Sequence, residues 1–139
     1  MRTFFFSVQG ESRTANLAAL FLRIGFGILM IPMHGYMKLI EFNIRKDEFV
    51  DFLGLGGTVS LSLAVFAELF CSILLVLGLF TRLASIPLLV TTMVIFSVHN
   101  WELFGKYELA TAFFIAYISI FTLGPGKYSL DYLITKRKR

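Results

Sequence analysis

The apolar run from Val59 to Phe80 most constrains what this chain can fold into, because it is long enough to cross a bilayer as one helix. A single ionisable residue, Glu68, lies in the middle of it. A second apolar run, Leu17 to Met33, likewise contains Arg23. An ionisable group at the centre of such a helix costs roughly 2.5–3.5 kcal/mol on insertion scales. Because such groups usually face a partner, a cavity or a ligand, both residues are candidates for a functional site.

The composition indicates that lipid is the solvent for most of the chain. Of the 139 residues, 57% are apolar and 16% are charged, and the mean hydropathy is +0.77. Soluble proteins average about 25% charged residues, and a domain this small could not bury so much apolar surface in water. We therefore expect a single all-α domain over residues 1–139, an integral membrane four-helix bundle. A soluble bundle of core helices is the alternative for the two weaker apolar segments.

The apolar segments predict four helices and a short interfacial helix in the first outer loop. The link at Thr81-Arg82 is so short that the second and third helices must form an antiparallel hairpin. The Gly35–Thr58 loop alternates aromatic with charged residues, which favours a short helix lying in the outer interface. The predicted membrane helices cover residues 16–34, 59–80, 83–99 and 108–123.

The distribution of Lys and Arg predicts the orientation. With four spans, both termini lie on one side, together with Arg2, Arg13, Arg82, Lys127 and the basic residues 136–139. The other side carries Lys38, Arg45, Lys46 and Lys106. The positive-inside rule then places both termini in the cytoplasm. In so apolar a chain the basic tail indicates a flank beside anionic lipid, so we expect no nucleic-acid partner.

One face of the first helix collects residues at steps of three and four: Arg23, Gly27, Met30, His34 and Lys38. Pro32 removes one backbone hydrogen bond and is expected to bend the helix. Arg23 and Glu68 differ by about 9 Å in depth at 1.5 Å per residue, a gap that the Arg side chain can largely span. An Arg23–Glu68 ion pair is one hypothesis. The alternatives are a ligand contact or proton relay by either residue, and lipid-facing snorkelling of Arg23.

Further polar residues crowd the predicted outer mouth of the bundle. His99 ends the third helix and Glu108 begins the fourth, both level with the upper part of the first helix. The candidate ligand-binding residues are therefore Arg23, His34, Lys38, Glu68, His99 and Glu108. A quinone headgroup suits this place, because His and Glu exchange protons and sixteen Phe can form an aromatic roof.

Other interpretations of the mouth stay open. An ordinary interfacial belt also contains His, Lys and Trp. Haem ligation by two His and a metal site formed by His34, His99 and Glu108 are alternative chemistries, although no metal is expected. A dithiol oxidoreductase acting alone is excluded, because Cys71 is the only cysteine. The sequence contains no phosphate-binding loop, nucleophile elbow or H-E-x-x-H pattern, so no catalytic residue is assigned.

Three motifs resemble the DoxX family of small four-helix bacterial membrane proteins. The stretch from Leu22 to the His34-Gly-Tyr-Met-Lys38 motif is similar to that family's first helix, and Glu68 with the segment 77–84 to its second helix and hairpin. Gly124-Pro-Gly-Lys-Tyr-Ser-Leu-Asp131 is similar to its closing motif. The order and spacing match over residues 15 to 133. The resemblance implies a four-helix bundle in the bacterial inner (cytoplasmic) membrane. The resemblance also implies that Arg23, His34, Lys38, Glu68, Arg82 and Asp131 correspond to residues of the family's motifs.

Two functions follow as expectations. The family is named after a subunit associated with thiosulfate:quinone oxidoreduction, and other members are linked to oxidative-stress assemblies. The resemblance and the mouth together imply a redox-associated subunit that binds a quinone-like apolar molecule, with other membrane redox subunits as partners. The alternative is a non-catalytic accessory or scaffold subunit of a larger membrane complex. A small transporter is a third option, against which the lack of an internal inverted repeat argues.

The closing motif predicts a structural clamp. Pro125 cannot continue the fourth helix and Gly126 can turn freely, so the helix should end there. Ser129 is expected to cap a short segment whose Asp131 faces Arg82 at the cytoplasmic end.

Overall fold

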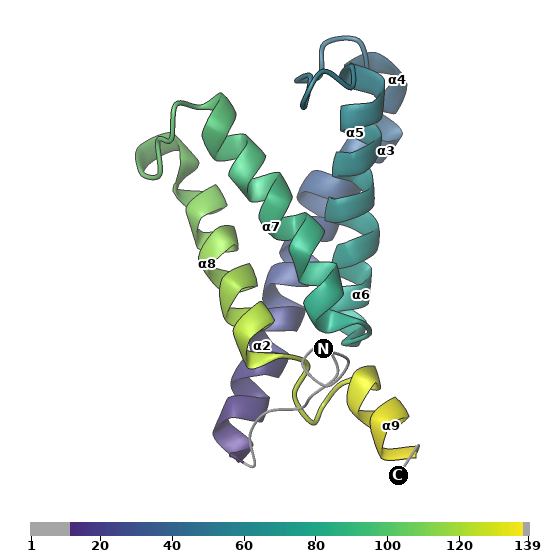
Figure 1. Ribbon diagram of the computed structural model, residues 1–139, viewed down its shortest axis with the longest axis vertical. Helices are drawn as coiled ribbons and strands as arrows, with labels where there is room; N and C mark the ends of the chain where they lie inside the picture. The colour runs from purple at the N-terminus through teal and green to yellow at the C-terminus, as the bar shows by residue number, and fades with distance from the viewer. Residues whose placement is uncertain (1–11, 138–139) are drawn as a thin grey trace.

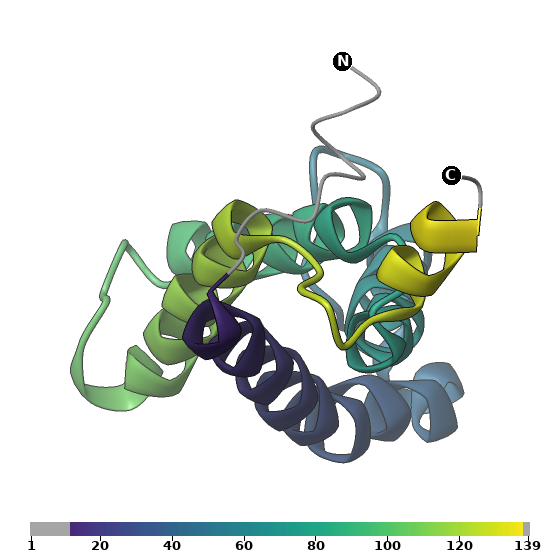
Figure 2. The same cartoon turned by 90° about the horizontal axis from the view of Figure 1, so that it is seen from below.

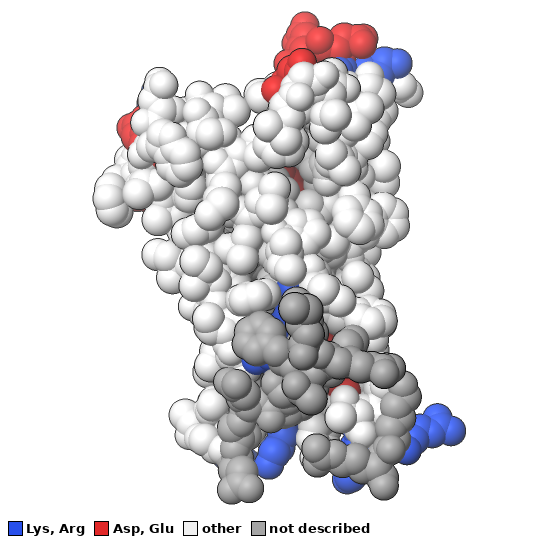
Figure 3. Space-filling view, viewed as in Figure 1, with Lys and Arg blue, Asp and Glu red and all other residues white. Residues whose placement is uncertain are grey.

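The computed structural model describes residues 12–137, and in that range the chain forms helices and turns without strands. Four helical stretches are long and apolar enough to cross a membrane: Arg13–Ile40, Gly57–Leu77, Thr81–Val98 and Gly105–Leu123. The predicted all-α fold with four membrane helices is therefore confirmed. Charged side chains gather at the two ends, with a broad uncharged band between them (Figure 3). Three of the basic residues that predict the cytoplasmic side, Arg2, Lys138 and Arg139, lie outside the described residues.

The first membrane helix is longer than predicted. It comprises α2 (Arg13–Met30), a π-helical turn η1 (Ile31–Tyr36) and α3 (Met37–Ile40). Pro32 lies at the start of the π-helical turn, where the sequence predicted a bend. The helix therefore continues six residues beyond the predicted end at residue 34, and Lys38 is part of it.

The first outer loop contains a helix of only four residues, α4 (Phe42–Arg45). The sequence predicted that the aromatic residues here lie in the membrane interface. In the structure, Phe42 and Phe49 pack against a buried cluster formed by Leu61, Val65 and Leu69. The loop thus folds back onto the second membrane helix, where these two Phe side chains are partly buried.

The second membrane helix also contains a π-helical turn. It comprises α5 (Gly57–Val65), η2 (Phe66–Cys71) and α6 (Ser72–Leu77). Gly78 then adopts a left-handed conformation with φ of 69°, and α7 (Thr81–Val98) begins three residues later, which gives the predicted tight hairpin. A short 3₁₀ turn η3 (Gly105–Tyr107) leads into α8 (Glu108–Leu123), whose bounds match the prediction. The chain ends in α9 (Leu130–Arg137).

The four long helices pack as a bundle that opens toward the end where α4 lies (Figure 1). Helix α2 contacts α6 and α8, and α7 contacts α8 and η2. The main core cluster lies where these helices meet and consists of Met30, Cys71, Leu75, Ala84, Leu88, Phe113, Tyr117 and Ile120. We call the end with α4 the outer end and the end with α9 the inner end.

The segment between α8 and α9 crosses the inner end of the bundle (Figure 2). Arg23 is fully buried there and donates hydrogen bonds to the carbonyl oxygens of Leu75, at 3.3 Å, and Tyr128, at 2.7 Å. The side-chain oxygen of Asn16 accepts a hydrogen bond from the Lys127 backbone N–H at 2.7 Å. Arg23 thus ties the first helix to the hairpin and to the closing segment.

The predicted clamp residues lie at this same end and make bonds that differ from those expected. Asp131 accepts hydrogen bonds from the backbone N–H groups of Phe80, at 2.8 Å, and Thr81, at 3.0 Å, and from the Thr81 hydroxyl at 3.0 Å. Arg82 donates to the carbonyl oxygens of Phe121, at 3.1 Å, and Thr122, at 3.3 Å. Asp131 therefore caps the start of α7, while Arg82 holds the end of α8.

Candidate functional site

An ion pair with a buried carboxylate forms the centre of the candidate site. Glu68 in η2 is 2% exposed, and its Oε2 lies 2.5 Å from Nζ of Lys38 in α3. The predicted Arg23–Glu68 pair is therefore wrong. Arg23 reaches toward the inner end, where two carbonyl oxygens accept its hydrogen bonds. The extended first helix brings Lys38 over Glu68 instead, and its flexible stem reaches into the apolar interior.

Two facing π-helical turns position this pair. The turn η1 packs directly against η2, and Gly35 permits the close approach. A Cβ atom at Gly35 would lie 2.6 Å from the backbone nitrogen of Leu69 and 2.7 Å from the carbonyl carbon of Glu68. Because π-helical turns are rare and occur frequently at functional sites, a facing pair of them marks this level of the bundle.

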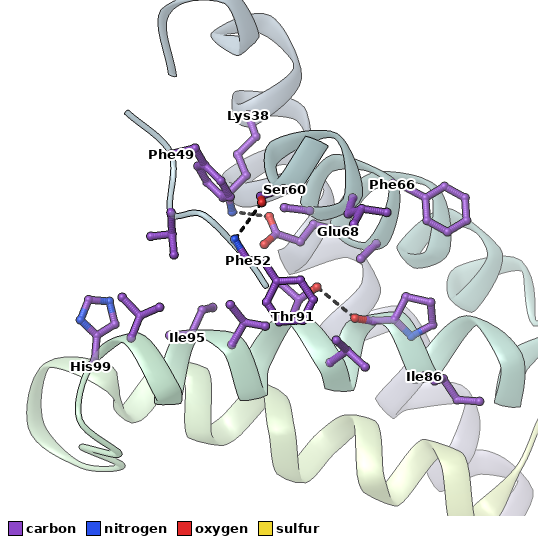
Figure 4. Close-up of a pocket in the computed structure, with 18 residues that line it drawn as sticks. Lys38, Phe49, Phe52, Ser60, Phe66, Glu68, Ile86, Thr91, Ile95 and His99 are labelled. Atoms are coloured by element: carbon purple, nitrogen blue, oxygen red, sulfur yellow. Dashed lines mark hydrogen bonds and ion pairs between the residues drawn. The ribbon is translucent and has the colours of Figure 1, made fainter. Parts of the chain in front are cut away.

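Two cavities adjoin Glu68, and the larger of these lies between the second helix and α7 and has a volume of about 450 Å³. Lys38 and Glu68 lie on one of its walls and His99 lies at its outer end (Figure 4). Most of the remaining wall is apolar. Several of its residues are exposed on the bundle surface, so the cavity opens toward the surrounding lipid: Val50, Leu63, Phe66, Ile86, Val90 and Val98.

The smaller cavity lies between the first helix, α7 and α8 and has a volume of about 190 Å³. His34 and Glu68 contribute to its wall, and the ring of His34 contacts the ring of Phe113 edge to face at 5.8 Å. Its other polar lining residues are Thr91, Thr92, Lys106 and Tyr107. Lys106 is exposed at the outer end, so this cavity opens there.

The two cavities share a thin wall. Glu68, Thr91 and Ile95 line both of them. At the outer end, the ring of His99, in the larger cavity, stacks on that of Tyr107, in the smaller one, with centroids 4.0 Å apart and an interplanar angle of 20°. The carboxylate of Glu68 is thus placed between two spaces of different chemistry.

The structure brings together four of the six predicted ligand-binding residues. Lys38, Glu68 and His99 line the larger cavity, and His34 joins Glu68 in the smaller one. Arg23 lies at the inner end, and Glu108 is exposed and lines neither cavity. Within residues 12–137, no three His, Cys, Asp or Glu side chains gather as a metal-binding group.

Sequence reasoning missed several polar residues of the site. Thr91 lies in the shared wall and Tyr107 stacks on His99. Ser72 follows Glu68 by one helical turn, and its hydroxyl is buried beside that of Tyr117, although neither residue lines either cavity. Hydroxyl side chains inside otherwise apolar helices are the sequence signal that could have indicated these residues. They do not stand out among ionisable residues.

Comparison with known proteins identifies one family. A family model described as DoxX matches residues 18–101, which is well over half of the chain. The match includes Lys38, Glu68 and both π-helical turns and ends before α8. No curated protein and no solved structure gives a significant match.

Proposed function

The chain belongs to the DoxX family, and for this integral membrane protein we propose a redox-associated role in which it binds a quinone-like apolar molecule in the larger cavity. One observation carries the proposal. A cavity of about 450 Å³ opens among lipid-facing apolar side chains and has the Lys38–Glu68 ion pair, with its buried carboxylate, on its wall. This volume lies within the usual range for small-molecule sites, and apolar walls with a few polar groups are typical of them.

The lateral opening supports a ligand that is dissolved in the bilayer. Leu63, Phe66 and Val90 line the cavity and are also about half exposed on the bundle surface. A molecule with an apolar tail can therefore enter from lipid without crossing water. The tail would remain among apolar side chains while the ring reaches the buried charges.

The polar groups fit both states of a quinone ring. The Lys38 ammonium can donate a hydrogen bond to a ring carbonyl oxygen, and the Glu68 carboxylate can accept one from the hydroxyl of the reduced ring. His99 at the outer end can act as donor or acceptor. Other membrane redox subunits would exchange electrons with the bound molecule.

A second candidate function is that of a non-catalytic accessory subunit. The observation that favours it is that Lys38 and Glu68 already neutralise each other at 2.5 Å. The pair would then serve to join the first and second helices, and lipid would fill the larger cavity. Ligand binding distinguishes the two functions.

The experiment is a binding titration of short-chain ubiquinone and of a short-chain menaquinone analogue to detergent-solubilised protein. Val90→Trp fills the larger cavity from its lipid-facing rim, whereas Met93→Trp on the same helix changes a residue that lines neither cavity. We expect saturable binding by the wild type and Met93→Trp, and loss of binding by Val90→Trp. Because both variants carry the same added ring, partition of the probe into the micelle is matched.

Equal, non-saturable uptake by all three proteins would contradict the proposal and favour the accessory subunit. The Glu68→Gln variant provides a second test in the same binding titration. It removes the carboxylate and keeps the side-chain volume, so a folded Glu68→Gln protein should bind the reduced, quinol forms of the probes more weakly than the wild type, because the quinol hydroxyl loses its charged acceptor.

A further inference from the structure

The smaller cavity differs from the larger one in chemistry, although the two share a wall. Its polar lining combines hydroxyl, imidazole and ammonium groups from three elements: His34, Thr91, Thr92, Lys106 and Tyr107. At about 190 Å³ it has room for about six waters, given that one water occupies about 30 Å³ in the liquid. Most of its wall is apolar, but its polar side chains and the exposed Lys106 at its mouth supply the hydrogen-bonding partners that water needs.

Glu68 is the only titratable residue that lines both cavities, since the other shared residues are Thr91 and Ile95. The titratable groups that face its carboxylate come from three elements. Lys38 from α3 forms the ion pair, and His34 from η1 and Tyr117 from α8 interact with it electrostatically. Of these, only His34 lines the smaller cavity together with Glu68.

We infer that the smaller cavity is a hydrated vestibule through which Glu68 exchanges protons with the aqueous phase at the outer end. His34 lies on the wall of the vestibule beside Glu68, and its imidazole can both donate and accept a hydrogen bond along this route. The inference deepens the proposed function and rests on it in one respect, namely that the proton serves a ligand in the larger cavity. The hydration of the vestibule stands on the geometry alone.

The vestibule is closed toward the inner end. Met30, Leu88 and Phe113 line it and also belong to the main buried core. The stacked rings of His99 and Tyr107 separate it from the larger cavity at the outer end. Protons would therefore reach Glu68 from the outer end, while the apolar ligand enters from the side.

Cysteine accessibility in a Cys71→Ala background tests the hydration. Thr92→Cys places a thiol in the vestibule, and Ser85→Cys is its matched control, two turns away on the same helix and outside both cavities. Both native residues are almost fully buried, with 2% and 0% exposure. With 2-aminoethyl methanethiosulfonate as the probe, Thr92→Cys should react at least about tenfold faster, because a thiol in a closed core reacts only during rare openings.

Equal slow rates for the two thiols would overturn the inference, because the vestibule would then be dry. A third thiol, Val90→Cys, reports on the larger cavity. Short-chain ubiquinone should slow the reaction of Val90→Cys and leave that of Thr92→Cys unchanged. If the quinone protects neither thiol while Thr92→Cys still reacts fast, the proposed function fails and the hydrated vestibule stands.

The proton exchange is tested by infrared spectroscopy at a pH low enough to protonate Glu68 and break its ion pair with Lys38, where the carboxyl C=O band of Glu68 is identified by its absence from Glu68→Gln. Modification of Thr92→Cys blocks the vestibule and should slow deuterium exchange of this band in D₂O, whereas treatment of Ser85→Cys should not. An exchange rate that is identical before and after modification of Thr92→Cys would overturn the proton route.

Discussion

At the scale of single residues, the Lys38–Glu68 pair is asymmetric. The side chain of Glu68 is 3% exposed, whereas that of Lys38 is 18% exposed and lies near the outer end. A carboxylate without its partner would remain buried, but an ammonium on a long flexible stem can turn toward water. The two residues should therefore respond differently to removal of the partner.

We predict that Lys38→Met lowers the stability more than Glu68→Gln does. Lys38→Met leaves an unpaired buried carboxylate, which costs about 3–5 kcal/mol, whereas Glu68→Gln should cost about 1–2 kcal/mol. The double variant should recover most of the loss. The apparent melting temperatures in detergent rank the three variants, with Lys127→Met at the exposed inner end as the control.

Equal losses for the two single variants, with additive loss in the double variant, would show that the two groups do not interact. That outcome would remove the ion pair from the candidate site.

The sequence predicted which polar residues lie near one another better than it predicted how they pair. His34, Lys38 and Glu68 stood out because ionisable residues are rare in apolar runs, and the structure brings them together. Their pairing depended on depth along the helices, which was calculated for regular α-helices with the first one ending at residue 34. The longer helix and its π-helical turn place Lys38 where the Arg23 guanidinium was expected.

At the scale of elements, the contact between η1 and η2 sets the position of Glu68. The contact requires a glycine at residue 35, because a Cβ atom there would lie within 2.8 Å of three backbone atoms of Glu68 and Leu69. Backbone atoms of a packed helix cannot move aside as a flexible side chain can.

We predict that Gly35→Ala destabilises the protein by about 3 kcal/mol, at the upper end of the usual cost of overpacking, and weakens probe binding because η2 must shift. Gly25→Ala is the matched control on the same helix, since a Cβ atom there meets nothing within 4 Å. It should be neutral or stabilising by up to about 1 kcal/mol. Thermal unfolding and the ubiquinone titration check both variants. A Gly35→Ala protein as stable as Gly25→Ala would show that the close contact is not required.

The inner end should contribute to stability without contributing to binding. Arg82 is buried, and its hydrogen bonds hold carbonyl groups at the end of α8. We predict that Arg82→Ala lowers the stability by about 2–3 kcal/mol, the upper range for hydrogen bonds to charged groups, and leaves ubiquinone binding unchanged. Exposed Arg13→Ala is the control. A stable Arg82→Ala protein that no longer binds the probe would show that the inner end contributes to binding, which contradicts this prediction.

The elements themselves were largely predictable, and their irregularities were not. The helix of residues 108–123 and a tight hairpin between the second and third helices followed from apolar length and short linkers. The sequence placed the link at Thr81-Arg82, whereas in the structure both residues already belong to α7. The two π-helical turns leave no signal in hydropathy, because one extra residue per turn does not change the composition of the run. The packing of Phe42 and Phe49 onto the second helix depends on contacts between segments that are distant in the sequence.

At the scale of the whole molecule, the two ends carry different charges. Acidic side chains gather over α4 and the loop that follows it, and basic ones gather at the inner end (Figure 3). This distribution supports a membrane orientation with the inner end in the cytoplasm. We propose that the protein lies in this orientation in a bacterial inner membrane.

The orientation predicts the labelling of single cysteines in a Cys71→Ala background. In intact cells with the outer membrane permeabilised, a membrane-impermeant maleimide should label Asp47→Cys in the outer loop and not Lys127→Cys at the inner end. Lysed cells, in which both should react, control for the reactivity of each thiol. Labelling of Lys127→Cys alone in intact cells would show that the protein has the opposite orientation.

The binding of a quinone-like molecule in the larger cavity is tested most directly by what the protein retains from its native membrane. Small molecules would be extracted from purified wild-type protein, Val90→Trp and Met93→Trp and identified by absorbance and mass spectrometry. A quinone present in the wild type and Met93→Trp and absent from folded Val90→Trp is the expected result. Extracts that contain only phospholipid, identical for all three proteins, would contradict the proposed function.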